Sequence, residues 1–63
     1  MKEILHFTAQ WCQPCKKMQP IIDEFLDKNQ EIMYTKIDVD NNGDKVTHYE
    51  VKSVPTLVIL EDK

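Results

Sequence analysis

Three short apolar runs along the chain have the length and composition of β-strands. Residues 3–8 and 56–60 are almost continuously apolar, and residues 31–39 are rich in β-branched and aromatic side chains. Runs of four to eight such residues, bounded by turn-forming residues, are typical of strands buried in a sheet. The pattern therefore predicts three strands.

Between these runs the spacing of apolar residues changes to that of a helix. Residues 13–29 carry apolar side chains at every third or fourth position, and the stripe consists of Met18, Ile21, Ile22, Phe25 and Leu26. This spacing predicts an amphipathic helix with one buried face. A shorter helix over residues 44–50 would bury Val46 and Tyr49. The predicted order of elements is βαβαβ.

Prolines and one polar turn mark the boundaries of these elements. Pro14 suits the first turn of a helix, whereas Pro20 lies inside the predicted helix and removes one of its hydrogen bonds. "DNNG" at residues 40–43 is a turn signal, and Pro55 ends the second helix. Strands alternating with helices predict a mainly parallel, three-layer α/β domain over residues 1–63, with the direction of the third strand left open.

Composition and charge restrict the class of partner. The chain has 63 residues, 8 basic residues that are all Lys, 11 acidic residues and a net charge of -3. An acidic surface argues against a dedicated binder of nucleic acid or of anionic membranes. No stretch approaches the ~20 apolar residues of a membrane span, and the first apolar run is too brief for a signal peptide. We therefore expect a cytoplasmic protein whose partners are proteins or neutral substrates.

The only two cysteines, Cys12 and Cys15, lie two residues apart at the junction of a strand and a helix. Free N–H groups and the positive end of the helix dipole stabilise a thiolate at such a junction. Cys12 would be an exposed, nucleophilic thiol at the helix start. Cys15, one turn further, would be partly covered and would attack a mixed disulfide intramolecularly. This arrangement predicts a working dithiol.

Two other uses of the cysteine pair are weaker. A structural metal site needs four ligands, and beyond the thiols only His6 and His48 offer nitrogen donors, without a second Cys-x-x-Cys. An inert disulfide staple across so short a loop gains little from loop closure.

The run "DVDNNGD", residues 38–44, imitates the start of a calcium-binding loop. Asp38, Asp40 and Asn42 stand where such a loop places its first ligands, followed by Gly43. The twelfth position holds Tyr49 where a bidentate Glu is required. We interpret the run as a strand end and turn, and expect no metal and no cofactor.

Four motifs in one order resemble the thioredoxin family. They are Trp11-Cys12-Gln13-Pro14-Cys15-Lys16, Pro20 five residues after the second Cys, Asp38-Val39-Asp40 at the end of a strand, and Val54-Pro55-Thr56 at the start of the last strand. The resemblance runs from about residue 3 to the end of the chain. It implies a thioredoxin-like fold.

The resemblance also implies reversible thiol–disulfide exchange with protein substrates. Cys12 would be the attacking thiol, Cys15 the resolving thiol, and Pro55 a cis proline that faces them. Val54 would pair its backbone with a substrate strand, a small case of strand addition. An apolar collar of Trp11, Pro14, Val54 and Pro55 would surround the thiols; the alternative for Trp11 is simple core packing.

Two positions depart from the family pattern. His6 stands six residues before Cys12, where thioredoxins usually carry a buried acid, and Thr8 stands at the usual second tryptophan. His6 would either accept the proton of Cys15 or, as an imidazolium, stabilise a thiolate. The alternative to both roles is a core histidine bonded to a backbone carbonyl. Lys36 matches the lysine that accompanies the buried acid, and beside His6 it would favour the neutral imidazole. The redox potential is expected to shift with these changes.

The ends of the family fold are not found in this sequence. The first strand and helix are missing, as in minimal glutaredoxin-like folds, and so are the closing β-hairpin and last helix. Residues 56–60 would then form an exposed apolar edge strand. This predicts self-association or a chain cut short.

Two functions from different classes follow. The first is an oxidoreductase that reduces disulfide-containing proteins and is recharged by an upstream reductase or a small dithiol. The second is a thioredoxin-like module that binds a partner protein and whose dithiol is incidental. The Cys pair and the collar favour the first.

Overall fold

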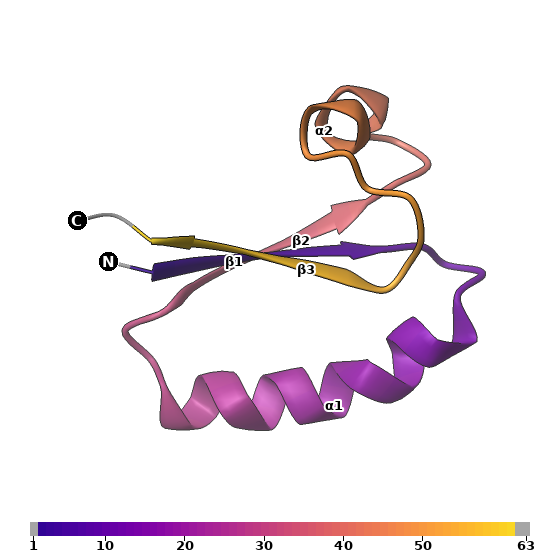
Figure 1. Cartoon of the computed structure of the whole chain (residues 1–63). Coiled ribbons are helices and arrows are strands. Elements are labelled where there is room, and N and C mark those ends of the chain that lie inside the picture. The colour runs from indigo at the N-terminus through magenta and orange to yellow at the C-terminus, as the bar shows by residue number, and fades with distance from the viewer. Residues whose placement is uncertain (1, 62–63) are drawn as a thin grey trace.

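The computed structural model describes residues 2–61 as one sheet between two helices (Figure 1). Helix α1 covers one face of the sheet and the shorter α2 lies over the other, so the predicted three-layer α/β architecture is confirmed. The single-domain prediction spans residues 1–63, of which residues 1, 62 and 63 lie outside the described part. The elements are β1 (Lys2–Thr8), α1 (Gln13–Lys28), β2 (Met33–Asp38), α2 (Gly43–His48) and β3 (Thr56–Glu61).

The sheet is mixed, so the expectation of a mainly parallel sheet is wrong. The strand order is β2-β1-β3; β1 runs parallel to β2, with His6 opposite Lys36, and antiparallel to β3. The connection from β2 to β3, residues 39–55, contains one six-residue helix, α2. It returns the chain to the end of the sheet that it left, so β3 starts there and runs antiparallel to β1.

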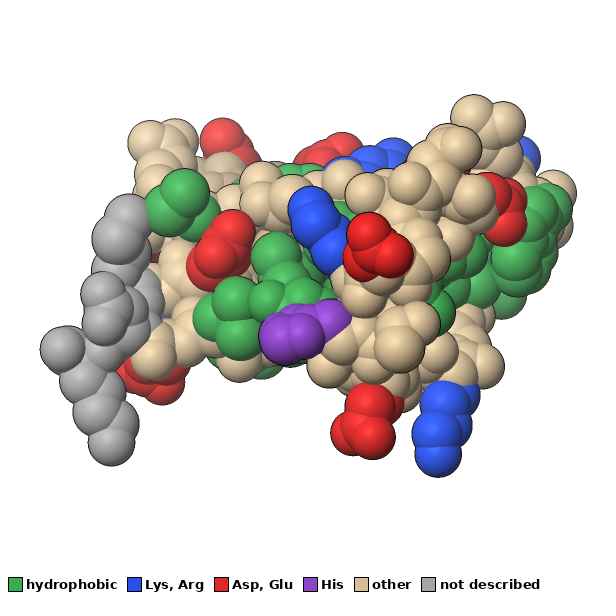
Figure 2. All heavy atoms as spheres, turned by 90° about the horizontal axis from the view of Figure 1, so that it is seen from above, with side chains coloured by type: hydrophobic (Ala, Val, Ile, Leu, Met, Phe, Trp, Pro, Cys, Tyr) green, Lys and Arg blue, Asp and Glu red, His purple; other side chains and the backbone are tan. Residues whose placement is uncertain are grey.

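The main hydrophobic core lies between the sheet and α2. It is formed by Leu5, Phe7 and Ile37, and Phe7 is completely buried. Val46 and Tyr49 pack against it from the α2 side, as expected from the sequence. Because α2 is short, hydrophobic side chains still show at the surface on this side of the molecule, between charged ones (Figure 2).

The other sheet face is covered by α1 only in part. Ile22 is the buried member of the α1 stripe, whereas Ile21 is 69% exposed and Phe25 46% exposed. Since Val58 and Leu60 pack in the α2-side core, strand alternation turns the exposed Leu57 and Ile59 toward the α1 side. The last strand is thus an apolar edge strand, as predicted.

The start of helix α1 is set by its N-cap residue and by a proline in its first turn. Cys12 has an extended backbone and is the N-cap, and a proline occupies the first turn. Pro20 lies inside the helix, which continues to Lys28 with Asn29 as its C-cap. Neither helix has the length and apolarity needed to cross a bilayer, as far as the chain is described.

Candidate active site

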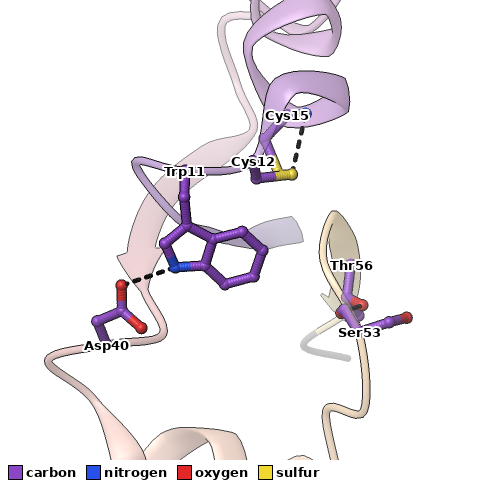
Figure 3. The surroundings of a disulfide bond; sticks show 6 residues. All are labelled: Trp11, Cys12, Cys15, Asp40, Ser53 and Thr56. Carbon is purple, nitrogen blue, oxygen red and sulfur yellow. Dashed lines mark hydrogen bonds between the residues drawn. A yellow bond between two sulfur atoms is a disulfide. The ribbon is translucent and has the colours of Figure 1, made fainter.

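Cys12 and Cys15 are joined by a disulfide at the start of α1, at the end of the sheet where β1 and β2 finish (Figure 3). Their Cα atoms are 5.3 Å apart, within the usual range for a disulfide. The Cys15 N–H donates to Cys12 Sγ at 3.2 Å, so the sulfur takes the place of an N-cap side-chain oxygen. A thiolate at Cys12 would keep this hydrogen bond and gain from the helix dipole.

Both cysteines are buried, which corrects the expectation that Cys12 is an exposed thiol. Cys12 is 3% exposed and Cys15 2% exposed. Together with Ala9 they form a small apolar cluster, against which Val39 and Val54 pack. The loops after β2 and before β3 thus cover Cys12 from the side.

Trp11 stands beside the disulfide and does not pack in the core. The residue is 65% exposed, so the core-packing alternative is wrong. Its indole Nε1–H donates to the Asp40 carboxylate at 3.0 Å, which holds the ring across the space between α1 and the loop after β2 (Figure 3). Asp40 was part of the Asp-Val-Asp motif, but its contact with Trp11 spans 29 residues and has no signal in the sequence.

Of the four predicted collar residues, Trp11 and Val54 lie beside the disulfide. Trp11 and Val54 line one groove, termed here the Trp11 groove, together with Val39, Val51 and Ser53. The Val54–Pro55 peptide bond is cis and both residues are half-buried. Pro14 is exposed on the first turn of α1 and is not part of this groove.

His6 lies under α1 and is fixed by side chains that the sequence did not suggest. Its ring is fully buried, and Nδ1 is 2.7 Å from the Tyr34 hydroxyl. The same hydroxyl contacts the Gln19 side-chain amide on α1 at 3.3 Å. The partner of His6 is therefore a tyrosine rather than the expected backbone carbonyl. Strand alternation places Tyr34 and Lys36 on one face of β2, a signal that would have identified Tyr34.

Burial and the charge of Lys36 hold His6 in its neutral form. Desolvation, and secondarily the nearby Lys36 ammonium, lower the pKa of His6 below its ordinary value of 6.5. An imidazolium that stabilises a thiolate, one of the two roles considered from the sequence, does not fit this environment. The neutral ring keeps Nε2 without a hydrogen-bond partner within residues 2–61.

Comparison with known proteins agrees with this geometry. The family model for thioredoxin matches residues 1–63. The chain belongs to the thioredoxin family. It is 38% identical over 61 residues to thioredoxin of Staphylococcus aureus, covering 95% of this chain and 59% of the relative. It is 34% identical over 61 residues to thioredoxin of Mycoplasmoides gallisepticum, covering 97% and 61%.

A solved structure shows the same fold. Mitochondrial thioredoxin 3 from Saccharomyces cerevisiae, in its oxidized form, superimposes with a TM-score of 0.94 at 36% identity, over 97% of this chain and 57% of that one. The chain thus spans about three fifths of the length of the thioredoxins it matches. All five described elements belong to the shared part.

In this thioredoxin-family chain the polar run after β2 is a turn. The Asp38 carboxylate accepts the Asp40 N–H at 2.9 Å, and the Asn42 side-chain amide donates to the Asp38 carbonyl at 2.8 Å. Asn42 is the N-cap residue of α2. Within residues 2–61 no three Cys, His, Asp or Glu side chains converge as a metal site would require.

The lowered pKa of His6 predicts an acid-sensitive fold. Below about pH 6.5 the unfolded chain binds a proton at His6 that the folded chain excludes. The contribution of His6 to the free energy of unfolding is therefore fully present above this pH and is lost as the pH falls. The slope from one such group is at most about 1.4 kcal/mol per pH unit. Urea unfolding between pH 5 and 8 should show this slope in the wild type and not in His6→Gln. The matched control His48→Gln should keep it; an equal slope in all three proteins contradicts the assignment.

Proposed function

We propose that this chain is a thiol–disulfide oxidoreductase that reduces disulfides in protein substrates. The observation that carries the proposal is the hydrogen bond from the Cys15 N–H to Cys12 Sγ at a helix start, because it favours the thiolate form of Cys12. Membership of the thioredoxin family supports the same chemistry. The site of action is proposed to be the cytoplasm.

The proposed reaction has two exchange steps. The Cys12 thiolate attacks one sulfur of the substrate disulfide, the other substrate sulfur leaves as a thiolate, and a mixed disulfide forms. The Cys15 thiolate then attacks Cys12 Sγ, which forms the Cys12–Cys15 disulfide and releases the second substrate thiolate. The substrate is reduced by two electrons and the protein is oxidised by two. An upstream reductase or a small dithiol would restore the dithiol.

The Trp11 groove is the proposed contact for the substrate. It lies next to the disulfide, and its apolar lining by Trp11, Val39 and Val54 suits an extended peptide. A substrate strand would pair with the backbone of Val54, while the Trp11 ring, held by Asp40, covers its side chains.

The reduction of insulin by dithiothreitol tests the proposed function. The wild-type protein at micromolar concentration should shorten the time to precipitation of the insulin B chain several-fold relative to dithiothreitol alone. A variant with both Cys12→Ser and Cys15→Ser should have no effect. A wild-type rate equal to that of dithiothreitol alone would reject the proposal.

We also propose that a second copy of the chain covers the apolar edge at β3. Leu57 and Ile59 are 39% and 66% exposed on an edge strand, which is an arrangement that favours strand pairing between molecules. Sedimentation velocity should show a concentration-dependent dimer that Ile59→Lys abolishes. A monomer at all concentrations would rule out this self-association.

A further inference from the structure

The Trp11 groove carries one charged side chain on an otherwise mostly apolar lining. It has a volume of about 280 Å³, and Trp11 and four valines make most of its wall apolar. Lys52 and Ser53 supply the polar part of the wall. Among the lining residues, all of which lie within residues 2–61, Lys52 alone is charged. A substrate in this groove therefore meets an ammonium group beside an apolar surface.

The charge of Lys52 is not neutralised by a neighbouring carboxylate. Lys52 is exposed and forms no ion pair within residues 2–61. Glu50, two residues earlier in the chain, does not line the groove. Asp40 lies at the edge of the groove, where its carboxylate accepts the Trp11 indole N–H at 3.0 Å. Figure 3 shows the Trp11 ring between Asp40 and Ser53, so the ring separates this carboxylate from the segment that carries Lys52.

The helix start beside the disulfide is also positive, although the whole chain has a net charge of -3. The first turn of α1 contains no acidic residue, and it ends at Lys16. The positive end of the helix dipole adds to this charge at Cys12, the N-cap residue. An acidic segment of a substrate is therefore attracted to this end of the molecule and repelled by the net charge of the rest.

Lys52 is placed to act on residues close to the substrate cysteine that reacts. Val54 packs against the cluster that contains Cys12, and Lys52 precedes Val54 by two residues. A substrate cysteine whose sulfur reaches Cys12 thus lies next to Val54. Since two residues of extended chain span about 7 Å, the side chain that meets Lys52 is two or three residues from that cysteine.

We propose that Lys52 is a specificity-determining residue, which selects protein disulfides that carry an acidic residue two or three positions from the reacting cysteine. The proposal rests on the proposed function, since it names the substrate class of the same site. The substrate carboxylate lies against the Lys52 ammonium, while neighbouring apolar side chains contact the valines of the groove. The Cys12 thiolate then attacks the substrate disulfide as described above. Lys52 changes how readily the substrate binds and leaves the exchange chemistry as it is.

Symmetrical disulfides of a short peptide with one cysteine test the proposal. Three peptides carry Glu, Gln or Lys at the second position on each side of the cysteine, so either strand direction brings the charge to Lys52. Each peptide disulfide oxidises the reduced protein, and the second-order rate constant is measured by alkylation and mass spectrometry. The selectivity of a protein is its rate constant for the Glu peptide divided by that for the Lys peptide.

The selectivity is expected to fall about tenfold from the wild type to Lys52→Glu at low salt, with Lys52→Gln in between. Differences in the intrinsic reactivity of the peptides cancel in this comparison, because both proteins meet the same peptides. The Gln peptide should react at a rate between those of the two charged peptides. In about 1 M salt the fall should shrink to less than about twofold, since salt screens exposed charges.

The matched control is Lys2→Glu, the same charge change at the start of β1, at the opposite end of the sheet from the disulfide. Its selectivity should stay within about twofold of the wild-type value. Circular dichroism spectra show whether each variant is folded. An unchanged selectivity in Lys52→Glu, or an equal fall in Lys2→Glu, would overturn the proposal.

Insulin reduction with dithiothreitol separates this inference from the proposed function. If the wild type accelerates insulin reduction while Lys52→Glu keeps the wild-type selectivity, only the role of Lys52 is wrong. If the wild type neither accelerates insulin reduction nor reacts with any of the three peptides, the proposed function is wrong and the role of Lys52 is rejected with it.

Discussion

Replacing Cys12 by Ser is expected to reduce the rate of insulin reduction to that of dithiothreitol alone, a loss of about a thousandfold or more in catalysis. The physical reason is that a serine hydroxyl at the helix start is not ionised near neutral pH, so no nucleophile remains for the first exchange step. Cys15 does not replace Cys12, because within residues 2–61 its sulfur accepts no hydrogen bond like the one that Cys12 Sγ accepts. Insulin precipitation should be measured on the same sample as the circular dichroism spectrum, which shows whether the variant is folded.

Replacing Cys15 by Ser should give a different result from replacing Cys12. The first step still occurs, but without the resolving thiol the protein should accumulate as a mixed disulfide with its substrate, visible by mass spectrometry. The alternative of a binding module with an incidental dithiol predicts instead that neither cysteine matters for function. Equal activity of wild type, Cys12→Ser and Cys15→Ser would favour that alternative and reject the mechanism.

Replacing Phe7 by Ala is expected to unfold the protein to a large extent at 25 °C. Among residues 2–61, Phe7 is the largest completely buried side chain, and its ring centroid lies 5.9 Å from that of Tyr49. Removing such a ring costs about 3–5 kcal/mol, whereas a domain of this size has a total stability of about 3–9 kcal/mol. The far-ultraviolet circular dichroism spectrum and a urea titration measure the loss.

The control for Phe7 is the same substitution at Phe25, which is 46% exposed on α1. Because half of that ring is already in contact with water, Phe25→Ala should cost less than half as much free energy of unfolding. If the two variants had the same urea midpoint, the core could not lie between the sheet and α2 as described.

The arrangement of helices and strands could be predicted because the two periodicities are well separated in this chain. The stripe from Met18 to Leu26 has helical spacing, and the run at residues 56–60 is continuously apolar. Turn residues and prolines fixed the boundaries to within one or two positions. The fold class followed from the order of elements together with the family motifs.

The direction of β3 and the surroundings of the site could not be predicted, because they depend on contacts between distant residues. Antiparallel pairing of β3 depends on the end of the sheet to which the connection from β2 returns, which periodicity does not show. The burial of Cys12 depends on Val39 and Val54 from two other loops. The hydrogen bond between His6 and Tyr34 joins neighbouring strands 28 residues apart.

The redox equilibrium of the Cys12–Cys15 pair tests the central claim most directly. The protein is equilibrated in glutathione buffers of increasing oxidation and the fraction of intramolecular disulfide is read by alkylation and mass. The account predicts a reversible two-electron transition with a midpoint potential near about -270 mV, the value characteristic of thioredoxin. The midpoint should differ from that value because a neutral His6 stands where thioredoxins carry a buried acid. Absence of an intramolecular disulfide at every buffer potential would contradict it.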